Sequence, residues 1–142
     1  MKKWIFAISV ILLLGILIFI LRSDEQDLGD NYYYLPRYEA IDIGFPGGGI
    51  IYKSTQKNVF SNIKIYGNVI NVNTNEDYIV AIQNADTSYI ATTHSTDAKK
   101  ESLQYFIIQK KSDLVYGPYT KEKYLQKREE LEVPKELQLK VE

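Results

Sequence analysis

Residues 78–83 read Tyr-Ile-Val-Ala-Ile-Gln, and residues 103–108 read Leu-Gln-Tyr-Phe-Ile-Ile. In both stretches apolar side chains occupy even and odd positions. Successive side chains of a strand point to opposite faces, so each stretch predicts a strand that is apolar on both faces. Strands of this kind lie centrally in sheets that are covered on both sides. The two stretches therefore predict a layered β domain built around them.

Shorter strand signals precede this pair. Tyr32–Leu35 predicts a short strand that stops at Pro36. Residues 38–45 place Ile41, Ile43 and Phe45 on one face, which predicts a half-buried strand. A turn at residues 46–47 would then lead into a returning strand over residues 50–52.

Gly67-Asn68 predicts a two-residue hairpin loop between residues 63–66 and 69–72. A loop at this place pairs Ile65 with Ile70 and Ile63 with Val72 on one apolar face. Turn chemistry and alternation agree on this register. We therefore expect an antiparallel hairpin over residues 61–73.

The C-terminal third predicts one helix between two short strands. Residues 114–116 resemble a strand that stops at Gly117-Pro118, and Thr120 is a suitable N-cap for a helix over residues 121–131. The helix should end before Val133-Pro134, because the residue before proline disfavours helical backbone. The alternation of Leu137, Leu139 and Val141 predicts a last edge strand.

The N-terminus carries the strongest compositional signal. Trp4 to Leu21 contains no charged residue and, as a helix, would be about 27 Å long, close to the thickness of a bilayer's hydrocarbon core. We expect a retained membrane anchor over residues 1–22. A cleaved signal peptide is the alternative, although the run is long and ends without small residues before a cleavage point.

Charges flanking the run predict its orientation. Lys2 and Lys3 precede it, and an acidic stretch follows it, so the bulk of the chain should lie outside the cytoplasm. Residues 23–31 carry several carboxylates and few apolar side chains, and we expect them to form an acidic tether. Membrane contact is thus predicted through Trp4 to Leu21.

Composition excludes several functions for the 142-residue chain. The formal net charge is −1 with interleaved signs, which argues against nucleic acid as a partner. The chain has one histidine and no cysteine, so we predict no metal site and no cofactor, and disulfides and lipid attachment through cysteine are impossible.

The stretch from residue 84 to residue 102 is long and mostly polar, and such loops are often functional or mobile. It holds His94, with Ser95 and Asp97 nearby. A catalytic set normally needs a rigid arrangement from distant segments, so a solvated loop histidine is the favoured interpretation. We predict no catalytic residues.

Two segments resemble a known family. They are Asp27-Leu28-Gly29-Asp30-Asn31-Tyr32 and the stretch from Tyr105 through Tyr116-Gly117-Pro118-Tyr119-Thr120 to Pro134, with Leu137 and Leu139. This pattern is similar to a family of small exported bacterial proteins, many of them lipoproteins, that is known only as a domain of unknown function. The resemblance implies a bacterial source and an envelope location. The chain departs from the family in lacking the lipoprotein cysteine, which favours a peptide anchor.

The sequence thus predicts an α+β protein: a mainly antiparallel β-sheet domain over residues 32–142 with one C-terminal helix, preceded by a single transmembrane helix. We expect a membrane-tethered interaction or structural domain that contacts an unidentified envelope protein. The predicted contact surface is Tyr32, Tyr33, Tyr34, Leu137, Leu139 and Val141. The alternatives are an envelope hydrolase that uses His94 or surface carboxylates, and a subunit of an envelope complex.

Overall fold

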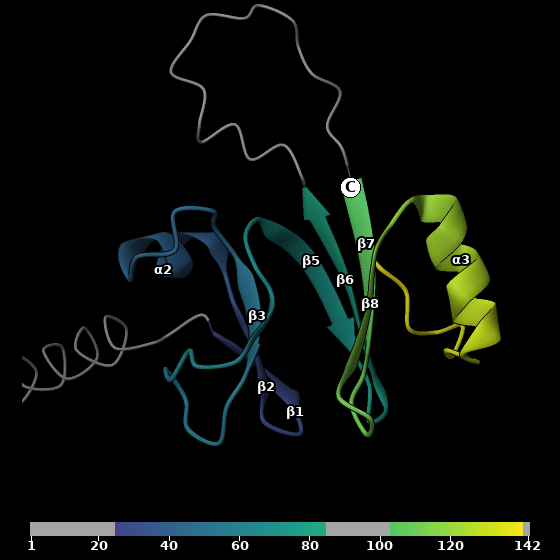
Figure 1. The fold of residues 1–142 in the computed structure, drawn as a ribbon, viewed down its shortest axis with the longest axis horizontal. Helices are drawn as coiled ribbons and strands as arrows, with labels where there is room; N and C mark the ends of the chain where they lie inside the picture. Colours follow the sequence, from purple (N-terminus) through teal and green to yellow (C-terminus); the bar gives the residue numbers. More distant parts are fainter. Residues whose placement is uncertain (1–24, 85–102, 141–142) are drawn as a thin grey trace, which may run out of the picture.

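The computed structural model describes residues 25–84 and 103–140, which form two packed antiparallel sheets with a helix on each outer side (Figure 1). The first sheet has the strand order β1-β2-β3-β4, and the second has the order β5-β6-β7-β8. The elements are β1 (Gln26–Gly29), β2 (Tyr32–Leu35), α2 (Arg37–Asp42), β3 (Ile50–Lys53), β4 (Ile63–Ile65), β5 (Val69–Thr74), β6 (Tyr78–Asn84), β7 (Leu103–Gln109), β8 (Leu114–Tyr119) and α3 (Lys121–Glu130). The antiparallel fold with a C-terminal helix is confirmed.

The second sheet is organised around β6 and β7, as the doubly apolar stretches predict. These two strands are central, and they pair in unbroken register from Tyr78 opposite Gln109 to Asn84 opposite Leu103. Ile79 and Ile108 point toward the first sheet, whereas Val80 and Ile107 point toward α3. Both faces of this pair are therefore buried.

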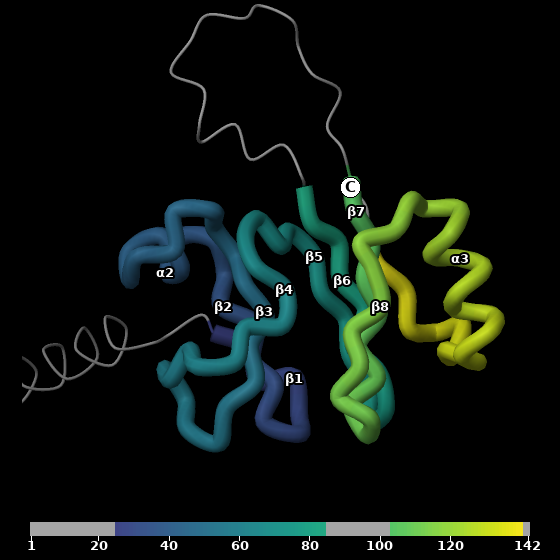
Figure 2. The backbone as a smooth tube through the Cα atoms, in the orientation of Figure 1, coloured from purple at the N-terminus to yellow at the C-terminus, as the bar shows by residue number. Residues whose placement is uncertain are grey.

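Three apolar layers hold the molecule together, and the backbone trace shows the elements on either side of each (Figure 2). The central layer between the sheets contains Leu28, Tyr32, Ile51, Ile65, Val69, Ile79, Ala81, Phe106 and Ile108. A second layer, between the second sheet and α3, contains Val80, Ile82, Tyr105, Ile107, Tyr124, Val133 and Leu137. A third layer lies on the outer face of the first sheet, around Leu35, Ala40, Ile50 and Tyr52.

The expected strand over residues 38–45 is wrong, because Arg37–Asp42 forms the short helix α2. The amide of Ala40 donates to the carbonyl of Pro36 over 2.9 Å, and Ala40 is fully buried. Ile43 is largely exposed, which the alternating pattern did not predict. The small Ala40 side chain lets a helical turn approach the sheet closely, and this tertiary contact outweighs the local strand pattern.

The expected hairpin at Gly67-Asn68 is also wrong. Both residues have positive φ, 82° and 46°, as a tight turn requires. However, β4 pairs with β3, Ile65 lying opposite Ile51, and β5 pairs with β6. The turn carries the chain from one sheet to the other, so that Ile65 and Val69 both enter the central layer.

Two further segments differ from expectation. Residues 26–29 of the predicted acidic tether form the edge strand β1, and Leu28 is buried in the central layer. The described part of the predicted last strand, residues 137–140, has no strand pairing. The side-chain amides of Asn71 and Asn73 instead donate to the carbonyls of Lys140 and Gln138, over 2.7 and 2.8 Å.

The strand before α3 is longer than expected. β8 continues through Gly117-Pro118 to Tyr119, with a register shift opposite residues 105–107 of β7. A Cβ at Gly117 would lie 2.6 Å from the carbonyl oxygen of Tyr105, so glycine is needed for this close approach. Because β8 is an edge strand, Pro118 can lie within it.

Within residues 25–84 and 103–140, no helix is long and apolar enough to cross a membrane. The predicted anchor from Trp4 to Leu21 lies outside these residues, as do His94 and Val141.

Candidate functional site

A groove of about 810 Å³ lies between α3, β7 and the C-terminal segment that follows the helix. Its apolar lining comes from both chain segments and from the sheet beneath: Tyr105, Tyr124, Leu125, Val133, Pro134 and Leu139. Volumes of 300–1,000 Å³ are typical of ligand sites in proteins. We call this feature the α3 groove.

Helix α3 begins at a side-chain cap, as predicted. The hydroxyl oxygen of Thr120 accepts a hydrogen bond from the amide of Lys123 over 3.3 Å. This cap satisfies one of the amides that a helix N-terminus leaves without a partner. Lys121 follows directly and lies at this end of the groove.

The chain reverses direction at the end of α3. The segment that follows the reversal forms one wall of the groove, opposite the helix. The amide of Val133 donates to the carbonyl of Arg128 over 2.9 Å, and Glu132 adopts a left-handed φ of 54°. The hydroxyl of Tyr78, from β6, donates to the carbonyl of Leu131 over 2.7 Å and ties this reversal to the sheet. The wall is therefore fixed to the core.

Two aromatic rings form the floor. The rings of Tyr105 and Tyr124 have centroids 5.1 Å apart with 30° between their planes, a tilted contact at a separation that aromatic pairs favour. Burial raises the pKa of Tyr124, although Arg128 acts in the opposite direction. The Tyr124 hydroxyl therefore stays protonated at neutral pH and remains able to donate a hydrogen bond.

Arg128 bridges the two walls. One guanidinium nitrogen donates to the Tyr124 hydroxyl over 3.1 Å, and the other donates to the carbonyl of Pro134 over 2.8 Å. The guanidinium carbon also lies 5.6 Å from the Tyr124 ring centroid. A planar donor held at both ends in this way is pre-organised. The shape of the groove is thus set without a ligand.

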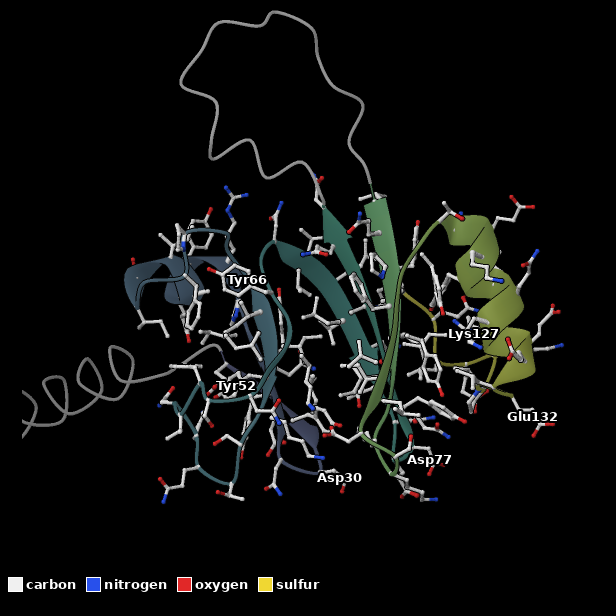
Figure 3. All side chains as sticks on the ribbon, in the orientation of Figure 1. Asp30, Tyr52, Tyr66, Asp77, Lys127 and Glu132 are labelled. Carbon is white, nitrogen blue, oxygen red and sulfur yellow. The ribbon has the colours of Figure 1, made fainter. Side chains whose placement is uncertain are left out.

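Charges of both signs line the apolar floor. Besides Arg128, they are Lys121, Glu129, Glu132 and Lys135. In the described part of the chain none of these four forms an ion pair. Figure 3 shows Glu132 and Lys127 at the α3 end of the molecule, away from the first sheet. The groove can therefore pair with both positive and negative groups around an apolar centre.

The titratable groups of the α3 groove can be compared with what acid–base catalysis requires. General acid or base catalysis needs a positioned group whose pKa lies near the working pH. In the groove, the pKa of the Tyr124 hydroxyl is raised, which moves it further from neutral pH. No group of three His, Cys, Asp or Glu side chains in residues 25–84 and 103–140 could hold a metal ion.

Two residues of the predicted contact surface are buried. Tyr32 is fully buried in the central layer, and Leu137 is buried beneath α3. Tyr33 and Tyr34 are half-buried, and Tyr33 stacks on Tyr52 with ring centroids 5.3 Å apart. The prediction is therefore wrong for Tyr32 and Leu137, which cannot reach a partner. Consecutive tyrosines on a strand alternate between faces, and both faces of this strand are covered.

Leu139 is the predicted contact residue that lines the α3 groove. Sequence reasoning missed the remaining lining residues, although the apolar positions Tyr124, Leu125 and Leu131 on the predicted helix were a usable signal. It could not show that residues 133–139 run back along the helix to form a second wall.

Tyr32 has a structural role where the sheets meet. Its hydroxyl donates to the carboxylate of Asp113, which lies in the β7–β8 turn. Lys64 and Lys53 lie 2.7 and 3.2 Å from the same carboxylate. Burial raises the pKa of Tyr32, and the hydrogen bond to Asp113 raises it further. This cluster joins three strands of the first sheet to a turn of the second.

The structure is that of a small two-sheet domain with a groove beside its C-terminal helix. A family model for proteins of unknown function, DUF3997, matches residues 30–142, and the chain belongs to this family. The expected resemblance to a family of uncharacterised proteins is thereby confirmed. No curated protein and no solved structure matches the chain.

Proposed function

We propose that this chain is a membrane-anchored binding domain, held outside the cytoplasm of a bacterium, whose α3 groove binds an extended segment of an envelope protein. The observation that carries the proposal is the pre-formed groove, with the tilted rings of Tyr105 and Tyr124 as its floor and, within the described residues, charges without an ion-pair partner at its rim. Protein-binding surfaces combine an apolar centre with a polar rim in the same way.

The chemistry of the walls suggests the kind of ligand. The floor and Leu125 offer an apolar surface for one or two side chains of a bound segment. Acidic and basic groups flank that surface, so a segment carrying both charges around an apolar residue would match it. Arg128 already holds the Pro134 carbonyl and the Tyr124 hydroxyl, so little ordering entropy is lost when a ligand binds.

The location rests on the sequence. The uncharged run from Trp4 to Leu21 and the preceding lysines support an anchor with the domain outside. Tethering confines the domain near the membrane and raises its effective concentration toward envelope partners.

Two leucines with equal exposure provide a matched test. Leu125 lines the groove and Leu114 lies on β8 outside it, and each side chain is 50% exposed. The full chain, in nanodiscs, is used to select peptides from a random display library. Leu125→Glu should lower the affinity of the domain for the selected peptides by at least about tenfold, or about 1.4 kcal/mol, because an apolar contact is lost.

Leu114→Glu should leave the affinity unchanged. Equal losses for the two variants, or selected peptides without a common pattern, would contradict binding in the groove. The hydrolase alternative places the chemistry on His94, which lies outside the described residues, or on surface carboxylates. His94→Ala should leave peptide binding and the cellular phenotype intact.

A further inference from the structure

Four large apolar side chains remain exposed around the outer face of the first sheet. Tyr38 and Ile43 lie in or just after α2, Val59 lies in the loop before β4, and Tyr66 directly follows β4. Their exposures are 83, 52, 41 and 56%, respectively. We call these four residues the outer patch.

Tyr66 connects the outer patch to the third apolar layer. Tyr66 packs edge-on against Phe45 with ring centroids 6.0 Å apart, and Phe45 packs against Phe60 at 5.3 Å. Phe60 in turn lies 4.8 Å from the ring of the buried Tyr52. The Tyr66 ring is thus the exposed edge of a packed aromatic cluster, which gives it a fixed position.

The chain enters the domain on this same face. The hydroxyl of Tyr52 donates to the carboxylate of Glu25, and Lys57 forms an ion pair with Glu25 over 3.2 Å. Both partners belong to β3 and the loop that follows it, next to the outer patch. Glu25 is therefore fixed beside the aromatic cluster.

Little chain separates Glu25 from the predicted anchor. Leu21, the last residue of the uncharged run, precedes Glu25 by four peptide units, which can span at most about 14 Å. A domain held at this distance must turn some face toward the bilayer. The face on which Glu25 is fixed is the outer face of the first sheet.

We propose that the outer patch rests on the lipid surface of the membrane entered by Trp4 to Leu21. This inference rests on the anchoring in the proposed function. Tyrosine is enriched at the level of lipid headgroups, where an apolar ring and a polar hydroxyl are both accommodated. Ile43 and Val59 would enter the boundary between headgroups and acyl chains, as apolar side chains of interfacial segments do.

Charge contributes little to this contact. Arg37 and Lys57 lie near the patch, but so do Glu39, Asp42 and Glu25, so the patch carries no excess of positive charge. The contact should therefore not require anionic lipid.

The lipid contact would also set the orientation of the α3 groove. Figure 1 places α2 and α3 on opposite sides of the two sheets, so the groove would face away from the membrane.

The absence of natural cysteine makes a direct test simple, since each introduced cysteine is the single thiol of the chain. The full chain is reconstituted in vesicles of equal parts phosphatidylglycerol and phosphatidylethanolamine. An environment-sensitive fluorophore is attached at Tyr66→Cys, Ile43→Cys or Tyr38→Cys. Leu114→Cys and Leu125→Cys are matched controls away from the patch. Spin-labelled lipid then quenches fluorophores that lie in the interface.

Patch positions should be quenched roughly twofold or more relative to the controls, because interfacial side chains lie about 5–10 Å into the headgroup region. If the chain floats with the vesicles but patch and control positions are quenched equally, the patch does not touch lipid, and the membrane anchoring in the proposed function is still supported. If the chain does not float, anchoring and the lipid contact both fail. Tyr38, the most exposed position, gives the decisive reading should Tyr66→Cys unfold the domain.

Discussion

At the residue scale, the polar contacts that matter most join the two sheets. Asp113 has a left-handed φ of 58°, which directs its carboxylate from the β7–β8 turn toward the first sheet. Lys110, in the same turn, donates to the carbonyls of Leu28 and Asn75, both over 2.5 Å. Burial lowers the pKa of Lys110, although nearby carboxylates oppose this. Buried polar groups need such partners, so this turn fixes the relative position of the sheets.

Asp113→Asn should lower stability at neutral pH by about 1 kcal/mol, a value reduced because the side chain is partly exposed. Burial pushes the pKa of Asp113 upward, but hydrogen bonds, first from Lys64, hold it at about 2, below the usual 3.8. A lowered pKa means that the stabilisation is present above pH 4 and is lost as pH falls toward 2.

Acid titration of the full chain in detergent, followed by circular dichroism, measures this effect. The variant should lack the part of the stability loss that the wild type shows between about pH 4 and 2. Asp30→Asn is a matched control, because Asp30 is exposed, has a similar φ of 52°, and forms no ion pair in the described residues. Identical acid profiles for wild type and Asp113→Asn would contradict the role of the carboxylate.

At the element scale, α3 and the segment after it form one unit. The Thr120 cap fixes where the helix begins, and the Val133–Arg128 hydrogen bond fixes how it ends. Tyr124 is the buried anchor of the helix, while Leu125 stays exposed in the groove. A helix of this length is marginally stable in isolation, so packing on the sheet, more than helix propensity, stabilises α3.

Thr120→Ala should lower the free energy of unfolding by about 1 kcal/mol, because the Lys123 amide loses its acceptor. Hydrogen exchange should accelerate first in the initial turn of α3. Thr120→Ser keeps the acceptor oxygen and should behave like the wild type. Unchanged exchange at Lys123 in the alanine variant would show that the cap contributes nothing.

At the scale of the whole molecule, the layers give the domain two different ends. The outer patch lies on the side of α2, and the α3 groove lies on the side of the C-terminal helix (Figures 1 and 3). The first described residue is fixed on the α2 side through Tyr52. A chain anchored through its N-terminus would thus separate a membrane face from a binding face.

Topology is testable with a membrane-impermeant maleimide on spheroplasts. Leu114→Cys, on the edge strand β8, should be labelled in intact spheroplasts, because the lysines before the uncharged run are expected to keep the N-terminus inside. Lys3→Cys should react only after permeabilisation. Labelling of Lys3→Cys alone in intact spheroplasts would reverse the assigned orientation.

The sequence by itself determined the features that depend on local chemistry. The doubly apolar runs at 78–83 and 103–108 identified the central strands, because burial on both faces requires it. Thr120 identified the start of α3, because its hydroxyl satisfies a helix amide. Positive φ at Gly67 followed from the same kind of local reasoning.

Tertiary structure alone decided how these elements combine. The hairpin predicted from the alternation around Gly67-Asn68 would bury Ile65 together with Ile70. The crossing between the two sheets instead buries Ile65 together with Val69 and leaves Ile70 exposed. Burial of Ala40 against the first sheet made a helix of residues 37–42, and burial of Leu28 made a strand of the expected tether. The groove arose where residues 133–139 fold back on α3. Each choice depends on apolar surface supplied by residues distant in the chain, and no local pattern records it.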